Sequence, residues 1–82
     1  MKDISPYISF LLDDVPCEVV LQEEKYFITL LANNSDHKAF DDLLPYIMEH
    51  KIMEVKDRIK ENFPKENFKY DVTYRIEKNE GY

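Results

Sequence analysis

Residues 68–77 alternate strictly between apolar and polar side chains, which is the pattern of a β-strand with one buried face. The apolar positions are Phe68, Tyr70, Val72, Tyr74 and Ile76, and the polar positions between them are Lys69, Asp71, Thr73, Arg75 and Glu77. Because successive side chains of a strand point to opposite faces, this segment predicts a sheet that is covered on one face and wet on the other.

Three earlier segments also have the residue patterns of regular structure. Ser5 and Pro6 are typical of a helix start, with the serine as N-cap, and the residue before Pro16 ends that helix. Two β-branched and aromatic runs, 17–21 and 26–31, are joined by a short polar segment. They predict a β-hairpin, although neither Asn-Gly nor Asp-Gly specifies its turn type.

A long helix is predicted by apolar residues that recur at steps of three and four positions. This stripe consists of Phe40, Leu44, Met48, Ile52, Val55 and Ile59. Pro45 lies inside it, so either Asp42 caps a helix with Pro45 in its first turn, or a short helix kinks there. The element order is α-β-β-α-β. We therefore expect one α+β domain over residues 1–82, with about three antiparallel strands and helices on one face.

The second strand of the hairpin carries more apolar residues than one buried face requires. Either Tyr26, Ile28 and Leu30 or the alternate pair Phe27 and Leu31 must point away from the helices. A small domain often covers such a surplus with a second copy of itself. We expect a homodimer that forms through the open sheet face or through a sheet edge, and the last strand can lie beside either strand of the hairpin.

Composition argues against several kinds of functional site. One glycine is too few for a glycine-rich phosphate loop, and one cysteine allows neither an intramolecular disulfide nor a multi-cysteine metal site. His37 and His50 have no ligands at zinc spacing, and a Cys17–His pair is disfavoured as a catalytic unit. The N-terminus has no apolar segment of signal-peptide length. We expect a cytoplasmic protein that is not an enzyme and holds no cofactor or metal.

Negative charge is concentrated in the first part of the chain. The net charge is −6, yet residues 1–50 carry ten acidic and three basic side chains, while residues 51–82 are almost balanced. The candidate partner-binding acids, most of them in doublets, are Asp13, Asp14, Glu23, Glu24, Asp36, Asp41 and Asp42. We expect the five aspartates to lie near one end of the hairpin, with the two glutamates about 20 Å away at its tip. The alternative is that they are solvated loop residues, some of which complement a helix N-terminus.

These acids suggest a non-enzymatic binding module that acts as an inhibitor. Acidic side chains spaced in this way can occupy the basic nucleic-acid-binding surface of a partner protein. In size, charge asymmetry and lack of chemical motifs the chain resembles, in type only, the nucleic-acid mimics that phages make against host proteins. Direct binding of nucleic acid by this chain is disfavoured by its own negative charge.

A second hypothesis uses an apolar ridge on the long helix. Tyr46, His50 and Met53 are spaced at i, i+4 and i+7, opposite the apolar stripe. Tyrosine and methionine are enriched in protein interfaces, although single exposed apolar residues are also common on ordinary surfaces. Under this hypothesis the chain is a small dimeric chaperone or regulatory adaptor, which binds its partner through Tyr46, Met53 and the exposed sheet face.

Overall fold

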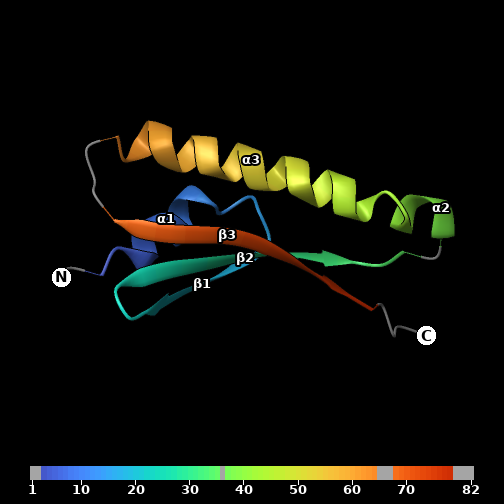
Figure 1. Ribbon diagram of the computed structural model, residues 1–82, viewed down its shortest axis with the longest axis horizontal. Coiled ribbons are helices and arrows are strands. Elements are labelled where there is room, and N and C mark those ends of the chain that lie inside the picture. The colour runs from blue at the N-terminus through green and yellow to red at the C-terminus, as the bar shows by residue number, and fades with distance from the viewer. Residues whose placement is uncertain (1–2, 36, 65–67, 79–82) are drawn as a thin grey trace.

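The computed structural model describes residues 3–35, 37–64 and 68–78, which form three helices and three strands. In chain order these are α1 (Ser5–Leu11), β1 (Cys17–Gln22), β2 (Lys25–Asn33), α2 (Lys38–Asp41), α3 (Leu44–Asn62) and β3 (Lys69–Glu77). The helices α1 and α3 pack on the sheet from one side, and α2 lies at the end of the elongated molecule (Figure 1). The expected α+β class is confirmed.

The sheet is mixed, which corrects the expectation that all its strands are antiparallel. Its order is β1-β2-β3; β1 and β2 form the predicted antiparallel hairpin, whereas β3 runs parallel to β2. The physical reason is the connection between them. Because α3 carries the chain back along the length of the sheet to the end where β2 begins, β3 starts beside Lys25 and runs in the same direction as β2 (Figure 1).

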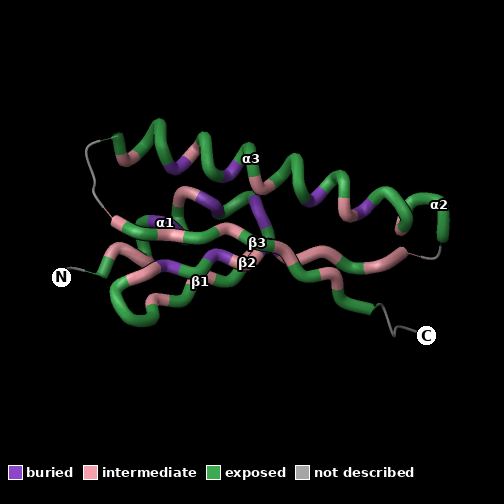
Figure 2. Tube along the Cα trace, viewed as in Figure 1, coloured by how far each residue is buried: buried purple, intermediate pink, exposed green. Residues whose placement is uncertain are grey.

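The core lies between the central strand and the two longer helices. Its buried residues are Ile8 and Leu12 around α1, Val15 before β1, Tyr26, Ile28 and Leu30 on β2, and Met48, Val55 and Ile59 on α3. Figure 2 shows these buried positions along β2 and on the sheet-facing side of α3. The central strand is flanked by β1 and β3, so its inward side chains are sealed on both sides as well as from above.

Phe27 and Leu31 are the large apolar residues of β2 that point to the uncovered face of the sheet. Ion pairs surround this face: Lys25 Nζ lies 2.6 Å from Asp71 Oδ2, and an Arg75 Nη2 lies 3.2 Å from Glu18 Oε1. The Lys25 ammonium also lies 5.4 Å from the centre of the Phe27 ring. The open face therefore consists of a small apolar centre that is bordered by ion-paired side chains.

Both predicted helix starts differ in detail from the structure. Ile4, not Ser5, is the N-cap of α1, and Asp3 Oδ1 accepts hydrogen bonds from the Ser5 backbone N–H (2.9 Å) and hydroxyl (2.6 Å). Pro45 lies in the first turn of α3, which is one of the two predicted arrangements. Asp42 does not cap this helix, however, because its N-cap is Leu43. The residues before it form the separate short helix α2.

The β1–β2 turn is made by two glutamates in left-handed backbone conformations. Glu23 has φ 52° and Glu24 has φ 66°. Since Gln22 pairs with Lys25, these two residues alone close the hairpin, and positive φ at both is what a type I′ turn requires. Residues with a Cβ atom adopt this conformation at a cost, so the turn is a strained point of the fold.

Candidate partner-binding surfaces

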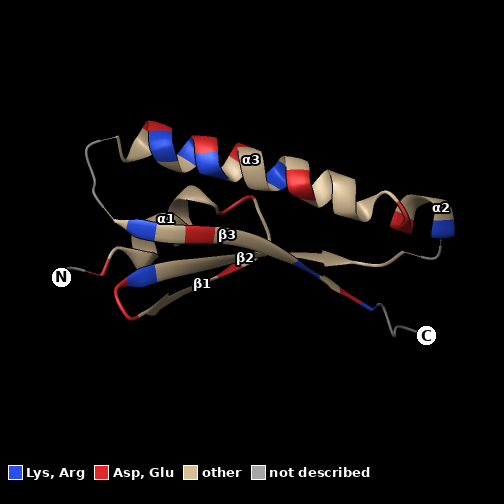
Figure 3. Cartoon of the chain, in the orientation of Figure 1, with Lys and Arg blue, Asp and Glu red and all other residues tan. Residues whose placement is uncertain are grey.

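The structure separates the described candidate acids into three places. Glu23 and Glu24 are at the hairpin tip, Asp13 and Asp14 follow α1, and Asp41 and Asp42 lie at α2 (Figure 3). The candidate Asp36 lies outside the described residues.

The expected grouping of Asp13 and Asp14 with Asp41 and Asp42 is wrong. Asp14 contacts Arg58, which is 14 residues beyond Leu44 on α3, or about 21 Å along the helix axis at 1.5 Å per residue. The loop after α1 therefore meets the opposite half of α3 from α2. The reason is that α3 is long, and the sequence alone does not show which part of it the loop after α1 contacts.

Asp14 connects the loop after α1 to α3 through an ion pair with Arg58. Arg58 Nη1 donates to Asp14 Oδ1 at 2.6 Å, Nη2 approaches Oδ2 at 3.4 Å, and Nη1 also donates to the Leu11 carbonyl at 3.3 Å. The hydrogen bond from Arg58 lowers the pKa of Asp14 below its ordinary value and raises that of the guanidinium. Because Asp14 is already paired within the chain, it offers little free charge to a partner.

Asp14→Asn is expected to lower the stability of the fold at neutral pH but not in strong acid. The pKa of Asp14 is depressed in the folded chain, so its contribution is present above the unfolded pKa near 3.8 and is lost as the pH falls through the folded value. Urea unfolding at several pH values measures this. Asp13→Asn is the matched control, because Asp13 has no ion pair within the described residues. A pH-independent difference between wild type and Asp14→Asn would contradict the expectation.

Asp41 has a structural role at the other end of the molecule. Its Oδ1 accepts hydrogen bonds from the Ser35 backbone N–H at 2.7 Å and from the Ser35 hydroxyl at 3.0 Å, and the Ser35 hydroxyl oxygen accepts the His37 N–H at 3.1 Å. These bonds fix the entry into α2. Within the described part of the chain, the candidate acids without an ion pair or side-chain hydrogen bond are Asp13, Glu23, Glu24 and Asp42.

Five large apolar side chains are exposed along α2 and α3, and we call them the α2–α3 apolar surface. They are Phe40, Leu43, Tyr46, Ile47 and Met53, with exposed fractions between 38 % and 68 %. Tyr46 and Met53 were predicted from sequence to face outward, and they do. Phe40 was predicted to belong to the buried stripe, which is wrong: α2 is a helix separate from α3, so the step of four residues from Phe40 to Leu44 does not place Phe40 on the buried side.

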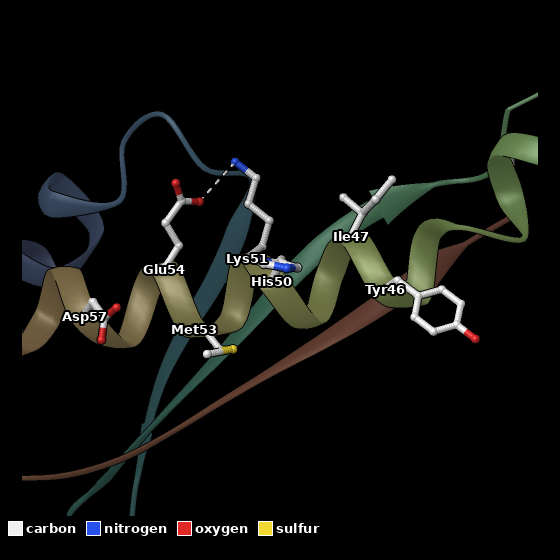
Figure 4. A pocket seen from close by; sticks show the side chains of 7 residues that line it. All are labelled: Tyr46, Ile47, His50, Lys51, Met53, Glu54 and Asp57. Atoms are coloured by element: carbon white, nitrogen blue, oxygen red, sulfur yellow. Dashed lines mark ion pairs between the residues drawn. The ribbon is translucent and has the colours of Figure 1, made fainter.

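An open hollow of about 570 Å³ lies on this surface of α3. Figure 4 shows two rows of side chains along the helix. Tyr46, His50, Met53 and Asp57 form one row, and Ile47, Lys51 and Glu54 form the other. Lys51 Nζ lies 3.6 Å from Glu54 Oε2. The hollow thus has apolar side chains toward the N-terminal part of α3 and acidic ones toward its C-terminal part.

The other groups that could carry chemistry show no organised site among the described residues. Burial raises the pKa of the Cys17 thiol, which makes it a poorer nucleophile at neutral pH. Within residues 3–35, 37–64 and 68–78 no group of three or more His, Cys, Asp or Glu side chains is placed to hold a metal ion. In the same part of the chain no helix has the length and apolar character needed to cross a bilayer.

Comparison of the chain with protein-family models, with curated proteins and with solved structures gave no match.

Proposed function

We propose that this chain is a non-enzymatic protein-binding module that recognises its partner through the α2–α3 apolar surface. The observation that carries the proposal is the set of five large apolar side chains along α2 and α3, each more than a third exposed, three of which line one hollow: Tyr46, Ile47 and Met53. Large exposed apolar clusters are uncommon on monomeric soluble proteins and mark interaction sites. The single half-buried cysteine is in keeping with a cytoplasmic location for this activity.

The lining of the hollow suggests which chemistry its partner presents. Tyr46 and Met53 offer a wide, adaptable apolar contact, and such residues often dominate binding energy when a partner covers them. Asp57 has no ion pair within the described residues and lies one helical turn beyond Met53 and Glu54. A partner segment with apolar side chains followed by a lysine or arginine would complement this surface.

The acidic surface remains a second candidate, in which the chain occupies the basic nucleic-acid-binding surface of a partner and inhibits it. The observation in its favour is the hairpin tip, where Glu23 and Glu24 project into solvent from a strained turn without any ion pair in the described structure. Against it, Asp14 and Asp41 are engaged within the chain, and the acids do not form one surface.

The two candidates are separated by capturing partners from a lysate on immobilised full-length variants. Tyr46→Ala/Met53→Ala should weaken retention of a true partner by roughly 30-fold or more, the effect of losing interface residues that dominate binding. Tyr7→Ala is the matched control, because Tyr7 is a similarly exposed tyrosine on α1. The captured protein should also stay bound in high salt, since apolar contacts are not screened.

A different result would favour the acidic candidate. If Glu23→Lys/Glu24→Lys releases the captured protein while Tyr46→Ala/Met53→Ala retains it, the α2–α3 apolar surface is not the interface. Elution at moderate salt and displacement by added DNA would then identify a basic nucleic-acid-binding partner.

A further inference from the structure

β3 is an edge strand that carries charged side chains of both signs but has neither a proline nor a bulge to prevent further pairing. It lies outermost in the order β1-β2-β3, and its register with β2 is unbroken over nine residues. It contains neither proline nor glycine, and within the described residues no strand pairs with its outer edge. Edge strands of this length usually carry a bulge, a proline or a run of lysines.

The side chains of β3 on the helix-facing side are also incompletely covered. Tyr70, Val72 and Tyr74 pack against the core but are only half-buried, whereas Tyr26, Ile28 and Leu30 of the neighbouring β2 are fully buried. The difference arises because β2 has a strand on each side and β3 has one. A further strand beside β3 would complete this layer.

The charges of β3 are complementary to themselves when the strand is paired antiparallel about its centre. With Thr73 opposite Thr73 of a second copy, Asp71 lies opposite Arg75 of that copy, and Lys69 lies opposite its Glu77. Within one chain Asp71 already pairs with Lys25, and Arg75 with Glu18 and Glu77, so the contacts between copies would extend existing ion pairs. On the helix-facing side, the same register opposes Tyr70 to Ile76 and Val72 to Tyr74. Opposite charges, threonine pairs and aromatic–β-branched pairs are the combinations that stabilise neighbouring antiparallel strands.

The adjacent registers are disfavoured by the same charges. A pairing centred on Val72 opposes Lys69 to Arg75, and one centred on Tyr74 opposes Asp71 to Glu77, so each creates like-charge contacts. The other sheet edge shows no such pattern, because β1 contains Glu18 as its only charged residue. Among these pairings, only the one centred on Thr73 gives opposite charges at every charged position.

We propose that two copies of this chain associate through antiparallel pairing of β3 with β3, centred on Thr73, to form one continuous six-stranded sheet. In this register odd-numbered residues face odd-numbered residues and even-numbered face even-numbered ones. The backbone N–H and C=O groups that point outward from one β3 therefore lie opposite the outward-pointing groups of the other β3 and can form hydrogen bonds with them. The two-fold axis stands normal to the sheet, and both helical layers lie on the same face. This inference does not depend on the α2–α3 apolar surface, since its test reads the mass of the chain alone.

The test is sedimentation equilibrium of the full chain over micromolar to millimolar concentrations. The wild type should reach twice the 9.9 kDa mass of one chain. Thr73→Lys and Thr73→Glu should each weaken dimerisation by about tenfold or more, because identical charges then meet at the two-fold axis. A mixture of the two variants should dimerise again, since only in this register does position 73 face itself.

Two further variants distinguish β3 pairing from other modes of association and from loss of the fold. Thr29→Lys is the matched control, because Thr29 lies beside Thr73 on the same face but on the central strand, so edge pairing should survive it. Lys69→Glu should weaken the dimer without harming the fold, because Lys69 neighbours Lys25 within the chain, and adding Glu77→Lys should restore dimerisation. Circular dichroism confirms that each variant is folded.

Three results would overturn the proposal. The first is a wild type that stays monomeric at millimolar concentration, and the second is dimerisation unaffected by both Thr73→Lys and Lys69→Glu. The third is loss of the dimer in Thr29→Lys to the same extent as in Thr73→Lys, which would mean that the copies meet through the open sheet face.

Discussion

Replacing Ile28 with alanine is expected to remove a major part of the protein's free energy of unfolding. Ile28 has no exposed surface, lies on the central strand and belongs to the core cluster with Ile8 and Val55. Removing a buried isoleucine side chain to Cβ costs about 2–5 kcal/mol. A domain of this size has a total stability of roughly 4–12 kcal/mol, so the loss is a major part of it. Urea unfolding followed by circular dichroism measures the shift of the midpoint.

Truncating an apolar side chain of the sheet to alanine should cost much less on the open face than on the face that carries Ile28. Val20→Ala removes a β-branched side chain from the adjacent strand, but Val20 is half-exposed on the open face. Its cost should stay below about 1 kcal/mol, and Ile28→Val should cost about 0.5–1.5 kcal/mol. If Val20→Ala were as damaging as Ile28→Ala, the open face would be covered in solution by something the single chain does not contain.

Replacing the turn residues Glu23 and Glu24 by Asn and Gly is expected to stabilise the fold by about 1–2 kcal/mol. Each glutamate holds a positive φ, which costs an L-residue roughly 1–2 kcal/mol, whereas Asn-Gly adopts the type I′ turn readily. Glycine also gains freedom in the unfolded chain, which offsets about 0.4–1 kcal/mol of this relief. The same urea unfolding experiment measures the increase.

A charge effect at the turn can be separated from a backbone effect. Glu24→Ala removes the charge but keeps the Cβ atom, so it should change stability by less than about 0.5 kcal/mol. If Glu24→Ala alone gives the full gain, repulsion between the glutamates rather than their backbone conformation strains the turn. The Asn-Gly variant also removes both acids of the tip, so its partner binding reports on the acidic candidate.

Regular elements were predictable wherever one periodicity extends over many residues. The alternation of 68–77 and the stripe from Leu44 to Ile59 correspond to β3 and α3, because burial of one face imposes those periods. Phe40 was misassigned because a helix break within a periodic run leaves no mark on the period. The parallel direction of β3 was missed for a similar reason, since alternation is the same in parallel and antiparallel strands.

The candidate surfaces were predictable only in part. Tyr46 and Met53 were placed on the outer side of α3 by helical spacing, and the structure adds Phe40, Leu43 and Ile47 to the exposed apolar residues along α2 and α3. The acids were identified as loop residues but not as engaged or free. Whether an acid is paired depends on its neighbours in space. Arg58 lies 44 residues from Asp14 in sequence, and no local sequence pattern predicts such a contact.

The amino-acid sequence by itself determined the α+β class, the succession of strands and long helix along the chain, the faces of β3 and the outward position of Tyr46 and Met53. These are local properties, since they follow from which side of a helix or strand each side chain occupies. Only the tertiary structure decided that β2 is central, that β3 is an edge parallel to it, and that the acids lie in three places. These depend on contacts between residues far apart in the chain, whose geometry is set by how α3 packs across the sheet.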